Sequence, residues 1–200
     1  MAELKYYKVL VVFVLLLSSC DFFNTREPEN PNSSDSQYLP QTSAESVISN
    51  FIKSFSERNT EYYLSTLIEK AKFPNNEFAF YPTSEALNQY PSTFDIWNLT
   101  NENQFMQMFK TKLPTSKKIN LIFSNPKSDF HSDSSVYVYD YYCELDSSIS
   151  PIPNKYSGII QLVILKNQNG QWAISKWYDF KKNNDTIVNT LSILKGKLSN

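Results

Sequence analysis

Few residues of this 200-residue chain could carry chemistry, and their inventory excludes several kinds of active site. His131 is the only histidine, and it lies in a polar stretch beside Asp129 and Asp133. A zinc centre or a Ser-His-Asp triad needs more than one loop-borne imidazole. We therefore expect a solvated histidine, with a loose cation site at these three residues as the minor alternative. Neither a metal centre nor another cofactor is predicted.

Glycine content and charge exclude two further classes of partner. The chain has three glycines, too few for a glycine-rich loop that cradles phosphates. Its 19 basic and 20 acidic residues give a net charge of −1. A nucleic-acid-binding protein needs a basic surface to neutralise phosphates, so no nucleic-acid partner is expected.

The Cys20 thiol has the clearest chemical setting in the chain. Lys5 and Lys8 precede an unbroken apolar run over residues 9–17, and Ser18-Ser19-Cys20 follows it. A basic region, a short apolar region and a small-residue cleavage site are typical of a secretory signal peptide. The apolar run is nine residues long, whereas a helix that spans a bilayer needs about 20.

The sequence Leu17-Ser18-Ser19-Cys20 resembles the lipobox of bacterial lipoproteins. The resemblance implies cleavage between Ser19 and Cys20, attachment of diacylglycerol to the sulfur, and acylation of the new amino terminus, typically with palmitate. Several acyl chains give a stable membrane anchor. We therefore expect a lipid-anchored protein of the bacterial cell envelope, facing the periplasm or the exterior, with the choice of membrane left open.

A polar segment separates this cysteine from the folded part. Residues 21–41 are rich in Asn, Ser and Glu and contain Pro28, Pro31 and Pro40. Low hydrophobicity without a periodic pattern is typical of disorder. The predicted organisation is thus a signal peptide at 1–19, the lipidated cysteine and a flexible tether at 20–42, and one folded domain at 43–200.

Helical periodicity fills the first part of this domain. Apolar residues between 47 and 55 recur at the spacing of one helical face after Ser43, a good N-cap. A second helix follows Asn59 or Thr60 and should end at Pro74. A third is predicted at 101–110, with Thr100 as its cap.

Alternating patterns then predict a sheet. Strands are expected at 77–81, 119–123, 136–145, 158–166 and 172–180. Residues 124–135 and 146–157 are predicted connections, and Gly170 can close the tight turn at 167–170. A short last helix is expected after Asp185, with Val188, Leu191 and Leu194 on one face. Helices first and strands afterwards indicate an α+β fold.

This order of elements, with Phe78-Ala-Phe80, the stretch from Trp97 to Phe109 and the ending Asn169-Gly-Gln-Trp-Ala-Ile-Ser-Lys-Trp-Tyr-Asp179, resembles the nuclear-transport-factor-2-like superfamily. The chain is especially similar to small lipoproteins that carry this cystatin-like cone domain. The resemblance covers about residues 43–195. It implies three N-terminal helices packed on a strongly curved antiparallel sheet, a pocket inside the cone, and frequent dimerisation through the sheet.

The last strand carries the strongest site candidates. Simple alternation places Trp172 and Ile174 on one side and Trp177 and Asp179 on the other. We favour a structural role, with one set under the helices and the other facing neighbours or solvent. In the alternative, Trp177 and Asp179 line a pocket. The full set of pocket or core candidates is Trp97, Tyr139, Tyr141, Trp172 and Trp177.

The resemblance gives the carboxylates a chemical meaning, because some enzymes of the superfamily abstract protons with an Asp inside the cone. Asp179, or Asp140 together with a Tyr, is the weak candidate for that role, and its pKa would have to be raised by burial. Arg58 is the only arginine of the domain, so an Asp–Arg–Asp centre is not expected. Cys143 is predicted to be a buried free thiol.

Three functional hypotheses follow. The first is a non-catalytic module that binds a small apolar or aromatic ligand or another envelope protein. The second is a cone-type isomerase or dehydratase, which requires a pocket that holds a carboxylate of raised pKa. The third is a structural lipoprotein that forms homodimers through its sheet. Because no converged set of acid and base residues is recognisable in the sequence, we favour the first and third.

Overall fold

The computed structural model describes residues 38–113, 116–146 and 152–200. The predicted signal peptide, Ser19, Cys20 and most of the predicted tether lie outside the described residues. Residues from Tyr38 onward form one compact unit. No helix within the described ranges combines the length and hydrophobicity needed to span a membrane.

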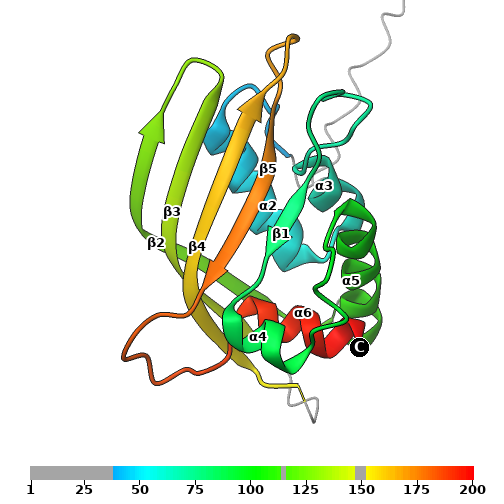
Figure 1. Cartoon of the computed structure of the whole chain (residues 1–200), viewed down its shortest axis with the longest axis vertical. Helices are drawn as coiled ribbons and strands as arrows, with labels where there is room; N and C mark the ends of the chain where they lie inside the picture. The colour runs from blue at the N-terminus through cyan, green and yellow to red at the C-terminus, as the bar shows by residue number, and fades with distance from the viewer. Residues whose placement is uncertain (1–37, 114–115, 147–151) are drawn as a thin grey trace, which may run out of the picture. The chain divides into compact units, whose positions relative to one another are not determined.

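Five strands form one sheet in the order β1-β5-β4-β3-β2 (Figure 1). Their bounds are Ala79–Tyr81 for β1, Ile119–Phe130 for β2, Ser134–Leu145 for β3, Lys155–Lys166 for β4 and Trp172–Phe180 for β5. Strands β2 to β5 pair with antiparallel neighbours, but β1 pairs in parallel with β5. The predicted all-antiparallel sheet is therefore wrong at this edge. A long connection separates β1 from β5, so no hairpin fixes their relative direction.

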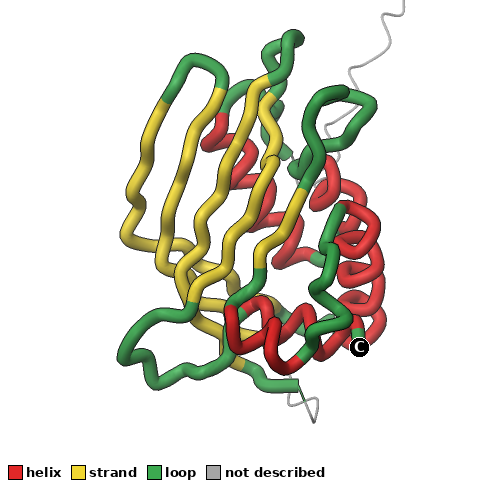
Figure 2. The backbone as a smooth tube through the Cα atoms, in the orientation of Figure 1, coloured by secondary structure: helices red, strands yellow, loops and turns green. Residues whose placement is uncertain are grey.

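Helices pack against the sheet, as the red segments in Figure 2 show. The described helices are α2 Ala44–Glu57, α3 Thr60–Ser65, α4 Ser84–Gln89, α5 Leu99–Lys112 and α6 Leu191–Ser199. Ser43 and Asn59 cap α2 and α3, as expected. The cap of α5 is Asn98 rather than Thr100, because the Asn98 side chain accepts hydrogen bonds from two backbone N–H groups and forms a capping box. Helix α4 was not predicted.

Two predicted helices differ in extent. Helix α3 ends at Ser65, well before Pro74, because the chain turns to the sheet and Leu67 pairs with Ile174. Helix α6 begins after Thr190 rather than Asp185. The Asp185 carboxylate instead accepts hydrogen bonds from Ser157 and from the backbone of Ile187. Val188 is not on the buried face, since 65% of it is exposed.

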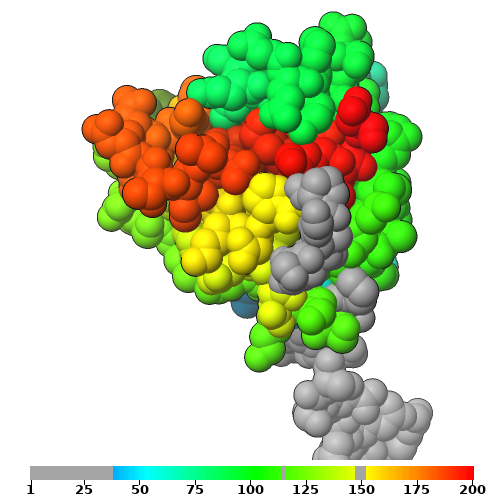
Figure 3. Space-filling model, turned by 90° about the horizontal axis from the view of Figure 1, so that it is seen from below, coloured from blue at the N-terminus to red at the C-terminus, as the bar shows by residue number. Residues whose placement is uncertain are grey.

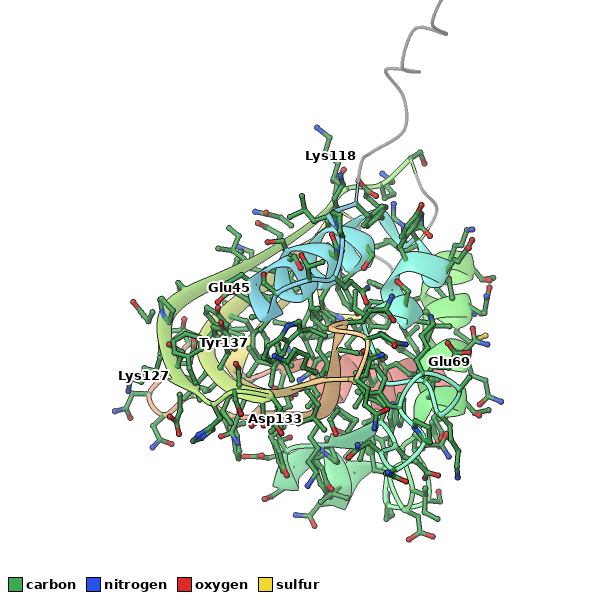
Figure 4. The ribbon with its side chains drawn as sticks, turned by 90° about the horizontal axis from the view of Figure 1, so that it is seen from above. Glu45, Glu69, Lys118, Lys127, Asp133 and Tyr137 are labelled. Carbon is green, nitrogen blue, oxygen red and sulfur yellow. The ribbon has the colours of Figure 1, made fainter. Side chains whose placement is uncertain are left out.

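Two β-bulges shape the sheet. One lies on β2 at Asn125, whose φ is 52°, and the strand continues beyond it through residues that were predicted as a loop. The other adds Ser175 to β5, between the pairs Ile164–Ile174 and Val163–Lys176. A bulge adds one residue and bends the strand. In Figure 4 the sheet bends around α2.

The bulge at Ser175 overturns the predicted facing of the last strand. Ile174 and Trp177 are three residues apart, yet neither is exposed, and Asp179 is 2% exposed. All three therefore face the helices, because the extra residue resets the alternation. The expectation that Ile174 and Trp177 lie on opposite sides is wrong.

Residues immediately before α2 pack on the domain. The Asn50 side chain exchanges hydrogen bonds with the backbone of Leu39, and the backbone N–H of Trp172 donates to the carbonyl of Gln41. The Tyr38 ring stacks on Tyr62 at a centroid distance of 3.8 Å. The chain thus enters the domain beside α2 and β5.

Helix α6 closes the space between the sheet and the other helices. It contacts α4, α5 and β4, and seen from below its red residues lie between the α4 region and the yellow beginning of β4 (Figure 3). Ser192, Leu194 and Lys195 are completely buried. The interior of the cone, meaning the space between the sheet and helices α2, α5 and α6, is therefore occupied by the chain itself.

Candidate functional site

Asp179 lies on β5 inside the cone, and its carboxylate is fully engaged. The Tyr141 hydroxyl donates to Oδ1 at 2.8 Å. The backbone N–H of Ser192 donates to Oδ2 at 2.7 Å, and the Ser192 hydroxyl donates to the same atom. Burial raises the pKa of Asp179 to about 6, while these hydrogen bonds act in the opposite direction. Asp179 is thus a weak acid whose Oδ1 accepts from Tyr141 on β3 and whose Oδ2 accepts from the first turn of α6.

Glu102 on α5 is a second buried carboxylate, and sequence reasoning missed it. The Tyr63 hydroxyl donates to Oε1 and the Trp97 indole N–H donates to Oε2, each at 2.5 Å. Lys195 on α6 completes the set with an ion pair to Oε1. Neither side chain of that pair is exposed to solvent. Each buried charge is therefore stabilised by the other, and the carboxylate also by the Tyr63 and Trp97 donors.

Four aromatic rings surround the Lys195 ammonium. Its Nζ lies 4.2 Å from the ring centroid of Trp177, 4.5 Å from Phe80, 4.6 Å from Phe105 and 5.0 Å from Trp97. Rings within about 6 Å attract a cation through their quadrupoles. We call these four rings the aromatic cage. Burial lowers the pKa of Lys195 to about 8, with Glu102 acting against the shift, so the amine is protonated at neutral pH.

The sequence of α6 explains how it fits this interior. Ser192 and Lys195 are three residues apart and share one helical face. Next to them, Gly196 permits close contact with Tyr90, because a Cβ there would lie 2.2 Å from a ring carbon of Tyr90. The signal for Lys195 in the sequence is its position among Leu191, Leu194 and Leu198, where a surface lysine would not be expected.

Little empty space remains between α5 and α6. A pocket between α5 and α6 has a volume of about 10 Å³ and is lined by Phe109, Leu113, Leu194 and neighbouring apolar residues, which is about the lower limit for one water molecule. Two buried donors, the Trp177 indole N–H and the Tyr156 hydroxyl, have no hydrogen-bond partner among the described residues. The cone interior therefore contains more polar groups than its contacts use.

The predicted aromatic candidates divide into an inner group and a rim. Trp97, Tyr141 and Trp177 meet at the buried carboxylates. Tyr139 is half-buried and contacts Phe123 at a centroid distance of 5.2 Å, away from the carboxylates. Trp172 is also half-buried, with the Lys166 ammonium 5.3 Å from its ring centroid.

Asp140, the other catalytic candidate, lies on the opposite face of the sheet. Its Oδ2 accepts hydrogen bonds from Lys182 at 2.7 Å and from Asn125 at 2.8 Å. The Lys182 ammonium and the Asn125 amide lower the pKa of Asp140. The structure therefore does not bring the two candidate carboxylates together, and Asp140 has the electrostatics of a surface ion pair.

The remaining predictions concern single residues. His131 forms an exposed 3.4 Å contact with Asp129, and no three potential metal ligands gather anywhere in the described ranges. Cys143 is a buried free thiol, as predicted, and burial raises its pKa. Arg58 is buried, and its Nη2 donates to the carbonyl of Lys117 at 2.6 Å, which links the end of α2 to the segment before β2.

A second polar contact joins α2 to the sheet at the other end of the cone. The Tyr137 hydroxyl donates to the Glu45 carboxylate, and Figure 4 shows the two residues side by side. Burial of the ring, followed by this hydrogen bond, raises the pKa of Tyr137. The contact fixes the beginning of α2 over β3 and is remote from Asp179.

Comparisons with known proteins add the fold class. A scan of protein-family models finds no match, and no curated protein matches the chain. Among solved structures, a proposed scytalone dehydratase of Novosphingobium aromaticivorans aligns at 10% identity over 74% of this chain and 89% of that one, with a TM-score of 0.52. A nuclear-transport-factor-2-like superfamily protein of Salmonella enterica aligns at 12% identity over 70% and 89%, with a TM-score of 0.50.

The chain also aligns with Bd1075 of Bdellovibrio bacteriovorus at 14% identity and a TM-score of 0.49, over 69% of this chain and 39% of that one. The structures with higher scores show that the domain has the nuclear-transport-factor-2-like fold, which confirms the predicted α+β class. At these identities the likeness carries the fold alone. The lipoprotein assignment stays a prediction.

Proposed function

We propose that this protein is a non-catalytic binding module, held at the cell envelope by a lipid on Cys20, that takes a small ligand or another envelope protein. The observation that carries the proposal is the engagement of Asp179. A general base needs a free lone pair within reach of a substrate. Here Tyr141 and Ser192 donate to both carboxylate oxygens, and α6 fills the space in front of them.

Carboxyl labelling tests the closed interior. We expect a water-soluble carbodiimide with an amine nucleophile to modify the exposed Asp129 and Glu77 and to leave Asp179 and Glu102 unmodified in the native protein. Peptide mass spectrometry measures each site, and urea-unfolded protein is the control in which all four react. Rapid native labelling of Asp179 would show that a reagent reaches this carboxylate, and would contradict the non-catalytic part of the proposal.

The anchor is tested at Cys20. We expect Cys20→Ser to remain unprocessed and to give no mature form in the detergent phase, because only the thiol forms the thioether with diacylglycerol. Cys143→Ser is the matched control, since Cys143 is buried inside the domain, and it should still partition with detergent. Normal processing and detergent partitioning of Cys20→Ser would refute lipidation.

One feature favours the isomerase or dehydratase alternative. Asp179 has a pKa raised to about 6 and accepts a hydrogen bond from Tyr141. These two residues form a usable acid–base pair if α6 moves away. The shared fold with a proposed scytalone dehydratase is consistent with such chemistry. Labelling of Asp179 in native protein, described above, is the outcome that would favour this alternative.

The homodimer alternative draws on the outer face of the sheet. Tyr81 and Phe180 are 41% and 45% exposed there, and the Tyr178 ring stacks between them. An uncovered aromatic surface of this kind is typical of an interaction site. Sedimentation of the lipid-free domain distinguishes a dimer from a monomer.

A further inference from the structure

Helix α6 places only donors in front of the two buried carboxylates. Its first turn contributes the Ser192 N–H and hydroxyl to Asp179, and one turn later Lys195 contributes an ammonium to Glu102. In the described part of the chain, no other lysine or arginine forms an ion pair with either carboxylate. The charge balance of the interior therefore depends on one helix at the end of the chain.

The aromatic cage is built without α6. Phe80 comes from β1, Phe105 from α5 and Trp177 from β5, and Trp97 precedes α5. Tyr63 on α3 and Trp97 hold the Glu102 carboxylate in place. A carboxylate inside a ring of aromatic faces is the chemistry with which proteins recognise ammonium ligands.

The interior carries polar groups that a purely structural core does not need. Replacing a buried ion pair with apolar residues is often neutral or stabilising, yet this domain retains Glu102 and Lys195 at its centre. It also leaves the Trp177 indole N–H and the Tyr156 hydroxyl without partners among the described residues. A buried donor without a hydrogen-bond partner destabilises the folded state.

We propose that the cone interior is a binding site for a primary alkylammonium ligand, that Lys195 occupies this site in the closed state, and that the ligand takes its place when α6 moves away. This inference rests on the proposed ligand-binding function and names its ligand class. The link from β5 to α6, residues 181–190, contains neither helix nor strand. It is held to the sheet by contacts of Lys182 with Asp140 and of Asp185 and Asn189 with Ser157, and these contacts must break when α6 moves away.

The geometry specifies the ligand further. The ligand must donate a hydrogen bond, because Glu102 accepts one from the Lys195 ammonium. Asp179 accepts from Ser192, three residues earlier on the same helix, so one turn of α6 supplies a donor to each carboxylate. A linear amine that carries a second donor, such as a diamine or an amino alcohol, has a donor for each of them.

Chemical rescue tests the site. Lys195→Ala in the full chain removes the atoms of one n-propylammonium ion. We expect this ion to raise the melting temperature of Lys195→Ala by several degrees, and 1-propanol at equal concentration and ionic strength to have no such effect. The control is Lys110→Ala, which removes an exposed lysine of α5 and should respond to neither compound.

If Lys195→Ala does not fold alone, the yield of refolded protein with n-propylammonium, compared with 1-propanol, is the readout. Equal effects of the two compounds would overturn the ammonium site in either format. Tetramethylammonium separates the two parts of the site, because it enters an aromatic cage without donating a hydrogen bond. Rescue by this ion as strong as by n-propylammonium would contradict the role of Glu102.

Hydrogen exchange on the wild-type chain tests the replacement of Lys195. With 1,4-diaminobutane, and not with 1,4-butanediol, we expect faster amide exchange across α6 and unchanged exchange in α2. Rescue of Lys195→Ala by n-propylammonium, with no change of amide exchange in α6 of the wild-type chain, would mean that Lys195 is a permanent structural cation. It would overturn the proposal that a ligand takes the place of Lys195. That result would leave the lipid anchor and the binding of another envelope protein intact, because detergent partitioning measures the anchor independently.

Discussion

The two faces of β5 show how one short strand serves two different environments. Trp177 and Asp179 point into the cone, where both are buried and the carboxylate has three donors. Tyr178 and Phe180 point outward, where the Tyr178 ring stacks on Tyr81 at 4.4 Å and on Phe180 at 6.3 Å. Beyond the bulge, alternation along the strand, rather than residue type, therefore decides whether an aromatic side chain of β5 belongs to the core or to an open surface.

We expect the largest loss of folding stability for a truncation on the inner face of β5, compared with truncations at its rim and outer face. We expect Trp177→Ala to destabilise the domain by about 3–5 kcal/mol, as for large aromatic truncations in cores, because its ring is unexposed and contacts Phe51, Phe80 and Lys195. The free energy of unfolding from urea titration measures this change.

Two other positions on β5 are the controls for Trp177→Ala. Trp172→Ala and Phe180→Ala should each lose clearly less stability, since Trp172 is half-buried and Phe180 is 45% exposed. Trp172 packs against the core from its edge. Equal losses at all three positions would mean that the inner and outer faces are not energetically distinct.

The second prediction concerns the buried ion pair. Glu102→Gln keeps the shape of the side chain but removes the carboxylate that pairs directly with the Lys195 ammonium, and breaking a buried pair in this way costs about 3–5 kcal/mol. Chemical denaturation at pH 7 measures the loss. Glu77→Gln is the matched control, because Glu77 pairs with Lys70 on the surface with most of both side chains exposed, and its unfolding midpoint should stay within error of the wild type.

Much of the fold could be predicted from the sequence because its periodic patterns are local. Ser43 and Asn59 cap helices with apolar faces, and the alternation from Val136 to Leu145 places Tyr141 and Cys143 on the buried side. The β2 strand beyond Ser124 was missed because its residues are polar and exposed on both faces. Helix α4 was missed because six residues carry too little periodicity.

The site was harder to predict because it depends on contacts between distant parts of the chain. Glu102 and Lys195 are 93 residues apart in sequence, and neither has a local partner that reveals the pair. No glycine or proline marks the bulge at Ser175 in the sequence. Simple alternation therefore predicted Trp177 and Ile174 on opposite faces of the strand, whereas both face the helices. Asp179 was recognisable as a candidate, whereas its engagement by Ser192 depends on where α6 packs.

The third prediction uses pH to compare the two faces. The pKa of Asp179 is raised in the folded state from 3.8 to about 6, so the folded protein binds the proton more tightly than the unfolded chain. The corresponding stabilisation is complete below about pH 3.8 and is lost as the pH rises toward 6. A shift of this size corresponds to about 3 kcal/mol. Asp179→Asn should remove this decline, as measured by urea denaturation between pH 4 and pH 7.

Asp140 on the outer face should respond with the opposite sign. Its pKa is lowered by Lys182 and Asn125, so its contribution is present above the unfolded pKa and is lost as the pH falls through the folded one. The carboxylate is partly exposed and its partner Lys182 more so, hence solvent screening keeps the effect small, and Asp140→Asn should leave the decline between pH 4 and pH 6 unchanged. If Asp140→Asn removed that decline and Asp179→Asn did not, the titrating carboxylate would be on the outer face. The raised pKa assigned to the buried Asp179 would then be wrong.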